Sequence, residues 1–179
     1  MSATPRLYHR RPLRLWGTVL YPLNDLKEIA PDLYQEHGAK YCGREEIRSQ
    51  RIGPLNCLWN DVLHLSPVHP QRVAELARAE GLLWREADWF EIDPIAAGFT
   101  STNTAVFRYS NLNIENSIGA DEFETFDIAK LAGMSRVPKQ TRDYYRTADR
   151  GAKYFIFAGV PHVLHKGALN VDSTPLVRA

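Results

Sequence analysis

The sequence predicts an α+β fold, with split and largely antiparallel sheets and flanking helices in a single domain. Hydrophobic residues make up 44% of the 179 residues and aromatic residues 11%, which is enough to form a core. Segments typical of strands and helices follow one another without the regular alternation of a doubly wound parallel sheet. No repeat or composition break is visible, so we expect one domain over residues 13–179, preceded by a loose basic arm over residues 1–12.

Hydrophobic periodicity and turn residues predict the individual elements. Runs rich in β-branched and aromatic residues predict strands over residues 14–23, 58–67, 87–94, 104–110, 122–128 and 152–161, with one or two more after residue 165. Apolar residues at helical spacing predict helices over residues 24–41, 71–81 and 138–151, the first of them split by Pro31.

Bulk properties limit the class of protein. The net charge of +1 gives no general footprint for nucleic acid or for an anionic membrane. The basic arm is either solvated or in contact with phosphate. The two cysteines form no CxxC pair, and both are expected to be buried and inert. Without a signal-peptide pattern or a long apolar span, we expect a cytoplasmic protein.

Polar residues interrupt the apolar run from Leu58 to Pro70. Asn60, Asp61 and His64 stand there within five positions. An imidazole oriented by a carboxylate can serve as an acid, a base or a ligand-binding group, which makes His64 a candidate catalytic residue. The alternative is a hydrogen-bonded, half-buried histidine on a strand.

Three further patterns carry weaker signals. His162 and His165 have a spacing that suits metal ligands on a helix, but no third ligand is marked and no metal site is predicted. Glu122 and Glu124 could act in acid–base chemistry or stabilise an oxocarbenium ion, or they could form a solvated strand face. Ser101 lies in a hydroxyl-rich loop whose side chains could instead satisfy local backbone groups.

Several segments resemble ADP-ribosyltransferases, specifically the DarT-type enzymes that modify DNA. The segments are LYPLNDLKEI, EIRSQRIGPLNCLWNDVLHLSPVHP and AKYFIFAGVP, which stand in the family's order. The resemblance implies that Tyr21 and Asn24 lie near the nicotinamide or its ribose and that Arg51 or Arg48 lies near the phosphates. It also places Lys153 where the family has its catalytic glutamate, which implies loss of the usual transferase activity.

A second pattern is similar to toxin-type ADP-ribosyltransferases. It consists of Arg14 or Arg11, the run Thr100-Ser101-Thr102, and Glu122-x-Glu124, in that order. This resemblance implies that Glu124 stabilises the oxocarbenium ion and Glu122 orients the acceptor. It also implies that Arg14 and Arg51 hold phosphate and that Ser101 steadies the site where the cofactor binds. The two resemblances share one fold and assign its glutamate differently.

The leading hypothesis is therefore an ADP-ribosyltransferase-like domain that binds NAD or a related nucleotide and transfers ADP-ribose to a protein or nucleic acid. Two alternatives stay open. One is a non-catalytic module in which Asp61, His64 and Arg51 grip an anionic ligand or a partner protein. The other is an unrelated small-molecule enzyme that uses His64 with Asp61. No membrane partner is expected.

Overall fold

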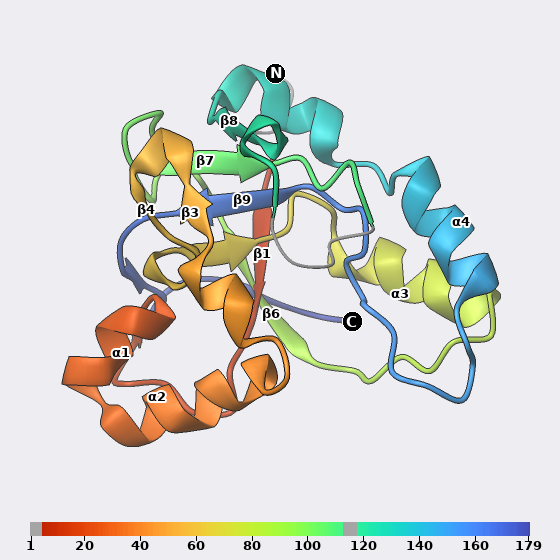
Figure 1. The fold of residues 1–179 in the computed structure, drawn as a ribbon, viewed down its shortest axis with the longest axis horizontal. Helices are drawn as coiled ribbons and strands as arrows, with labels where there is room; N and C mark the ends of the chain where they lie inside the picture. The colour runs from red at the N-terminus through yellow and green to blue at the C-terminus, as the bar shows by residue number, and fades with distance from the viewer. Residues whose placement is uncertain (1–4, 113–117) are drawn as a thin grey trace.

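Two antiparallel sheets, joined through the N-terminal strand, form the frame of the protein (Figure 1). The computed structural model describes residues 5–112 and 118–179. The first sheet has the order β1-β6-β11 and the second the order β5-β9-β7-β8. Their strands are β1 (Leu7–Arg10), β5 (Leu63–Leu65), β6 (Asp88–Ile92), β7 (Thr104–Phe107), β8 (Phe123–Thr125), β9 (His162–His165) and β11 (Leu176–Arg178). The chain thus has a mixed α and β architecture with antiparallel sheets, as the sequence predicts.

Strand β1 connects the two sheets. It pairs along its whole length with β6, from Leu7 opposite Ile92 to Arg10 opposite Trp89. Tyr8 also exchanges two backbone hydrogen bonds with Ser66, directly after β5, at 2.8 and 2.9 Å. Figure 1 shows β1 running across the direction of β7 and β9. Residues 7–10 are therefore part of the frame and not of a loose arm, because the fully buried Leu7 anchors them in the core.

Two small ladders and four α-helices complete the described part of the chain. The ladders pair β2 (Val19–Leu20) with β10 (Leu169–Asn170), and β3 (Arg51–Ile52) with β4 (Cys57–Leu58). The α-helices are α1 (Leu23–Ile29), α2 (Pro31–Gly38), α3 (Pro70–Ala79) and α4 (Lys139–Thr147). Short 3-10 helices are η1 (Ala39–Tyr41), η2 (Glu45–Ser49), η3 (Gly53–Leu55), η4 (Trp59–Asp61), η5 (Ala120–Glu122) and η6 (Ile128–Met134).

Local sequence signals explain where the helices begin. Pro31 and Pro70 each occupy the first turn, where the missing N–H costs nothing. The His69 imidazole caps α3 by accepting a hydrogen bond from the Gln71 backbone N–H at 3.1 Å. The predicted split at Pro31 and the helices after Pro70 and near Pro138 are confirmed.

The helices lie in two groups at opposite ends of the molecule (Figure 1). Helices α3 and α4 share an apolar cluster with the outer side of the three-stranded sheet, which includes Trp89 and the fully buried Tyr145. Helices α1 and α2 pack mainly on each other through Leu26, Ala30 and Leu33. The second pair therefore contributes little to the main core, and its inner face is left to line a cavity.

Three expected strands differ from the structure. Only Val19–Leu20 of residues 14–23 forms a strand, since Gly17 adopts a left-handed conformation with φ of 60° and turns the chain. Residues 58–67 are broken by η4, which carries Asn60 and Asp61. The apolar residues 152–161 form turns and coil, and β9 begins only at His162. Apolar runs alone did not distinguish a strand from a buried loop.

None of the helices in the described ranges has the length and apolar composition that crossing a lipid bilayer would require.

Candidate functional site

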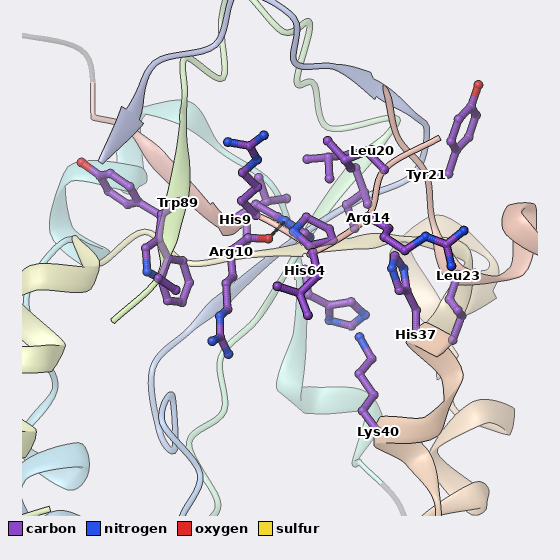
Figure 2. Close-up of a pocket in the computed structure, with 18 of the residues that line it drawn as sticks. His9, Arg10, Arg14, Leu20, Tyr21, Leu23, His37, Lys40, His64 and Trp89 are labelled. Atoms are coloured by element: carbon purple, nitrogen blue, oxygen red, sulfur yellow. Dashed lines mark hydrogen bonds between the residues drawn. The ribbon is translucent and has the colours of Figure 1, made fainter. Parts of the chain in front are cut away.

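A cavity of about 1020 Å³ lies between the helices α1–α2 and the junction of β1 with β5. This is a volume that accommodates a drug-sized or nucleotide-sized molecule. Residues from β1, the loop that follows it, α2 and β5 supply most of the polar lining. Figure 2 shows His9 and His64 near the centre, Lys40 below them, Trp89 to one side, and Arg14 and His37 to the other.

The carboxylates that line the cavity are neutralised by arginines. Glu36 lies 3.0 Å from the Arg14 guanidinium. Glu86 lies 3.3 Å from the Arg178 guanidinium and 3.9 Å from that of Arg78, and Asp88 lies 3.2 Å from Arg178. These pairs leave the acidic groups of the lining without uncompensated charge.

Three cations of the lining have no such partner. Arg10, Arg11 and Lys40 lack a carboxylate within 4 Å among the described residues. Burial and the nearby Arg44 lower the pKa of the Lys40 ammonium, although its side chain still reaches solvent at the cavity mouth. The cavity therefore offers a positive field to an anionic ligand.

Three histidines in the cavity have fixed tautomers. His9 Nδ1 lies 2.8 Å from the Arg10 carbonyl, His64 Nε2 lies 2.9 Å from the Trp59 carbonyl, and His162 Nδ1 lies 2.8 Å from the Val160 carbonyl. A carbonyl oxygen only accepts, so the bonded ring nitrogen carries the proton in each case. The opposite nitrogen of each neutral ring is left as a hydrogen-bond acceptor.

The pKa values of these three histidines are all lowered. Burial, together with the neighbouring His162 and Lys40, lowers the pKa of His64 to about 3. Burial, together with Lys40, lowers the pKa of His9 to about 4. Burial also lowers the pKa of His162 to about 4. At neutral pH these groups are uncharged acceptors, which suits hydroxyl donors such as those of a sugar.

Aromatic and unpartnered polar groups complete the lining. Trp89 packs edge-on against Phe157 with ring centroids 5.5 Å apart. The indole Nε1 of Trp89 and the side-chain oxygen of Asn60 are buried without a hydrogen-bond partner among the described residues. Both residues border the cavity. Buried polar atoms without partners are uncommon in folded proteins, and they point to groups that a ligand or water satisfies.

The structure brings together three of the predicted site residues. His64, Arg14 and Tyr21 line the cavity. Figure 2 shows Tyr21 at the edge of the group, with its ring directed away from the centre. Arg14 is occupied by Glu36, as described above. Only His64 thus stands at the centre of the site with a free ring nitrogen.

Asn24 and Asp61 have a different role. The Asn24 side-chain amide donates to Asp61 Oδ1 at 2.6 Å, and the Leu58 backbone N–H donates to Asp61 Oδ2 at 2.7 Å. Both carboxylate oxygens are therefore used to dock α1 against η4. The expected pairing of His64 with Asp61 does not form, since the ring is held by the Trp59 carbonyl instead.

The remaining predicted residues lie outside the cavity lining. Arg51 donates to Asn56 on the exposed β3–β4 hairpin, and Ser101 is exposed in a turn organised by Asn103. Glu122 accepts hydrogen bonds from the backbone and hydroxyl of Ser110. Glu124 lies on β8, at the edge of the four-stranded sheet that is farthest from β5. The glutamates are consequently not brought to His64.

The residues implied by the DarT-type pattern also separate. Lys153 is exposed in the loop after α4. Arg48 donates to the Gly38 carbonyl at 3.1 Å, where it braces the end of α2. Cys42 is exposed and only Cys57 is buried, so the expectation of two buried thiols is wrong for Cys42.

The histidine pair on β9 is divided by the geometry of a strand. Successive side chains alternate between faces, so a spacing of three places His162 and His165 on opposite faces. His162 borders the cavity, whereas His165 stacks on Phe99 at 4.0 Å and bonds Thr104. No group of three or more His, Cys, Asp or Glu side chains within residues 5–112 and 118–179 is arranged to hold a metal ion.

Sequence reasoning missed several residues of the cavity. His9 and Arg10 fell within the segment expected to be a loose arm. Lys40 follows His37 at a spacing of three, and helical geometry places residues so spaced on one face. That spacing was a usable signal, and both residues line the cavity.

Comparison of the chain with protein-family models, with curated proteins and with solved structures gave no match. The site is therefore argued from its own geometry.

Proposed function

We propose that the protein is an ADP-ribosyltransferase-like domain whose cavity binds NAD or a related phosphate-bearing nucleotide. One observation carries the proposal: among the described residues, Lys40 and Arg10 have no acidic partner and line the cavity with three uncharged imidazoles, while every lining carboxylate is paired with an arginine. Cations suit phosphate, and neutral acceptors suit ribose hydroxyls. The proposal concerns binding and assigns no transfer step to Glu122 or Glu124.

Its support is the complementarity of the cavity with the parts of a nucleotide. A phosphate can approach Lys40 at the mouth, where the ammonium acts as a point charge. The ribose then lies beside His9 and His64, whose free nitrogens accept hydrogen bonds. The volume of about 1020 Å³ leaves room for a base against the aromatic lining, which includes Trp89.

Calorimetric titration with NAD, AMP and adenosine tests the proposal. We expect NAD and AMP to bind and adenosine to bind at least about tenfold more weakly, because adenosine lacks the phosphate. Lys40→Ala should weaken AMP binding about tenfold and leave adenosine binding unchanged. The affinity for AMP should also fall as salt rises.

Arg51→Ala is the matched control, since it removes an exposed cation on the β3–β4 hairpin, outside the cavity. Equal effects of Lys40→Ala and Arg51→Ala would contradict the proposal. So would a folded protein that binds neither NAD nor AMP at millimolar concentration.

A further inference from the structure

Asn60 is a buried amide that the protein itself leaves unused. It is 2% exposed, and its side-chain oxygen is buried without a hydrogen-bond partner among the described residues. It lies in η4, between Trp59, whose carbonyl holds His64, and Asp61, which docks α1. The residue also borders the cavity. Its neighbours on both sides are thus fixed by hydrogen bonds, whereas the Asn60 side-chain oxygen accepts none from the described residues.

An unpaired buried amide destabilises the free protein, because the group loses its bonds to water and gains none in return. An apolar residue would fill this place more favourably in the absence of a ligand. Functional sites are where such local costs are retained. The unused amide therefore indicates a group that reaches it from the cavity.

The chemistry of the amide limits what that group can be. Asparagine offers one acceptor and one donor side by side, and it pairs best with an edge that has an adjacent N–H donor and acceptor. Phosphate has no such edge, and a single hydroxyl bonds only one of the two polar groups of the amide. Amino-purines have this arrangement in the exocyclic amine and the neighbouring ring nitrogen.

We infer that Asn60 reads the base of the bound nucleotide and selects bases that carry an N–H donor beside a ring acceptor. This inference rests on the proposed function and deepens it, since it names the ligand's base edge. Lys40 and the imidazoles address phosphate and sugar, which every nucleotide shares. Asn60 is then the residue that distinguishes one nucleotide from another.

The test compares AMP with purine riboside 5′-monophosphate, which lacks only the 6-amino group. We expect the wild-type protein to bind AMP at least about tenfold more tightly, because the analogue leaves the amide half satisfied. The Asn60→Leu variant should bind AMP only as tightly as it binds the analogue. Its affinity for the analogue should differ little from that of the wild-type protein. The ratio of the two affinities should therefore approach one.

Thermal unfolding of Asn60→Leu without ligand is a second readout. Removal of an unsatisfied buried amide should raise the melting temperature by about 2–4 °C. A fall in melting temperature would contradict the inference, because it would show that a buried water already satisfies Asn60 and that the leucine displaces it.

The outcomes separate the two proposals. If neither nucleotide binds, the proposed function fails and the inference with it. If wild-type protein binds both equally, or if Asn60→Leu weakens both by the same factor, the inference fails while nucleotide binding stands. The comparison of the two ligands with wild-type protein needs no variant, so the test holds even if a variant does not fold.

Discussion

The cavity and the β7–β8 edge of the four-stranded sheet contain similar side chains in opposite states. At the β7–β8 edge, Glu122 is bonded by Ser110 and the hydroxyl-rich turn is organised by Asn103. In the cavity, the side-chain oxygen of Asn60 and the indole N–H of Trp89 have no hydrogen-bond partner among the described residues, and His64 uses only one of its two ring nitrogens there. The first region satisfies its polar groups internally, and the second does not.

The difference teaches where ligand chemistry is available. A polar group already bonded by its neighbours must break that contact to bind anything else. A polar group at a cavity wall that has no partner can bind a ligand without first breaking a hydrogen bond. For this reason the most polar segments of the sequence stabilise the fold through hydrogen bonds of their own. The polar groups that remain available to a ligand come from segments without a clear signal in the sequence.

The largest expected effect that separates the two regions is the pH dependence of stability. Burial lowers the pKa values of His9, His64 and His162 in the folded protein, so the unfolded chain binds more protons between about pH 6.5 and 4. The contribution of these uncharged histidines to the free energy of unfolding is complete above about pH 6.5 and is lost as the pH falls. We expect each histidine to cost on the order of 1–2 kcal/mol of unfolding free energy between pH 7 and pH 5.

Urea unfolding at the two pH values measures this loss. The hydrogen bonds to Glu122 lower the pKa of that carboxyl, so its contribution disappears only at more acidic pH and leaves this interval to the histidines. Burial also lowers the pKa of His165, on the opposite face of β9, to about 4, so this histidine adds a similar share from outside the cavity. His64→Gln should reduce the loss of unfolding free energy between pH 7 and pH 5 by about the amount that one histidine contributes. A flat stability from pH 7 to pH 5 would contradict the burial of uncharged imidazoles.

Asp61→Ala should have the next largest effect, and on stability instead of ligand binding. The change removes the acceptor for Asn24 and for the Leu58 backbone, and we expect a loss of about 2 kcal/mol in unfolding free energy. Asp32→Ala is the control: Asp32 is 82% exposed and lies 3.9 Å from Arg14, so its loss should stay within about 0.5 kcal/mol. If Asp61→Ala weakened nucleotide affinity and left stability unchanged, the result would show that Asp61 contributes to ligand binding.

Glu124→Gln should have the smallest effect. Glu124 lies on β8, outside the cavity lining, so nucleotide affinity should change by less than about twofold, in contrast to Lys40→Ala. Calorimetry and release of nicotinamide from NAD check this together. Nicotinamide release by wild-type protein that Glu124→Gln abolishes would restore the transferase hypothesis for this residue.

Much of the fold could be predicted from local signals. Pro31 and Pro70 marked helix starts, and alternation over residues 104–110 marked β7, because these features depend on neighbouring residues alone. The run over residues 152–161 misled, since burial in a loop between α4 and β9 requires apolar residues as a strand does. The short β1 was missed because its strand conformation depends on β6 and Ser66, which lie 60 to 80 residues away in the sequence.

The site was less predictable than the fold. His64 was found because it interrupts an apolar run. Its expected partner, Asp61, stands three residues before it, but η4 turns that carboxylate toward α1. His9, Lys40 and Asn60 meet only through tertiary structure, and no local pattern joins them. Adjacency in sequence was a poor guide to adjacency in the cavity.

The double pairing of β1 has a consequence for how the cavity is assembled. The strand that presents His9 and Arg10 is secured by residues 66 and 88–92, and β6 is in turn paired with β11 at residues 176–178. Contacts between such distant segments form only after large chain loops close, which makes them slow to form. The cavity wall should therefore be among the last parts of the protein to form, and loss of β1 from the sheet would dismantle the site while the helices persisted.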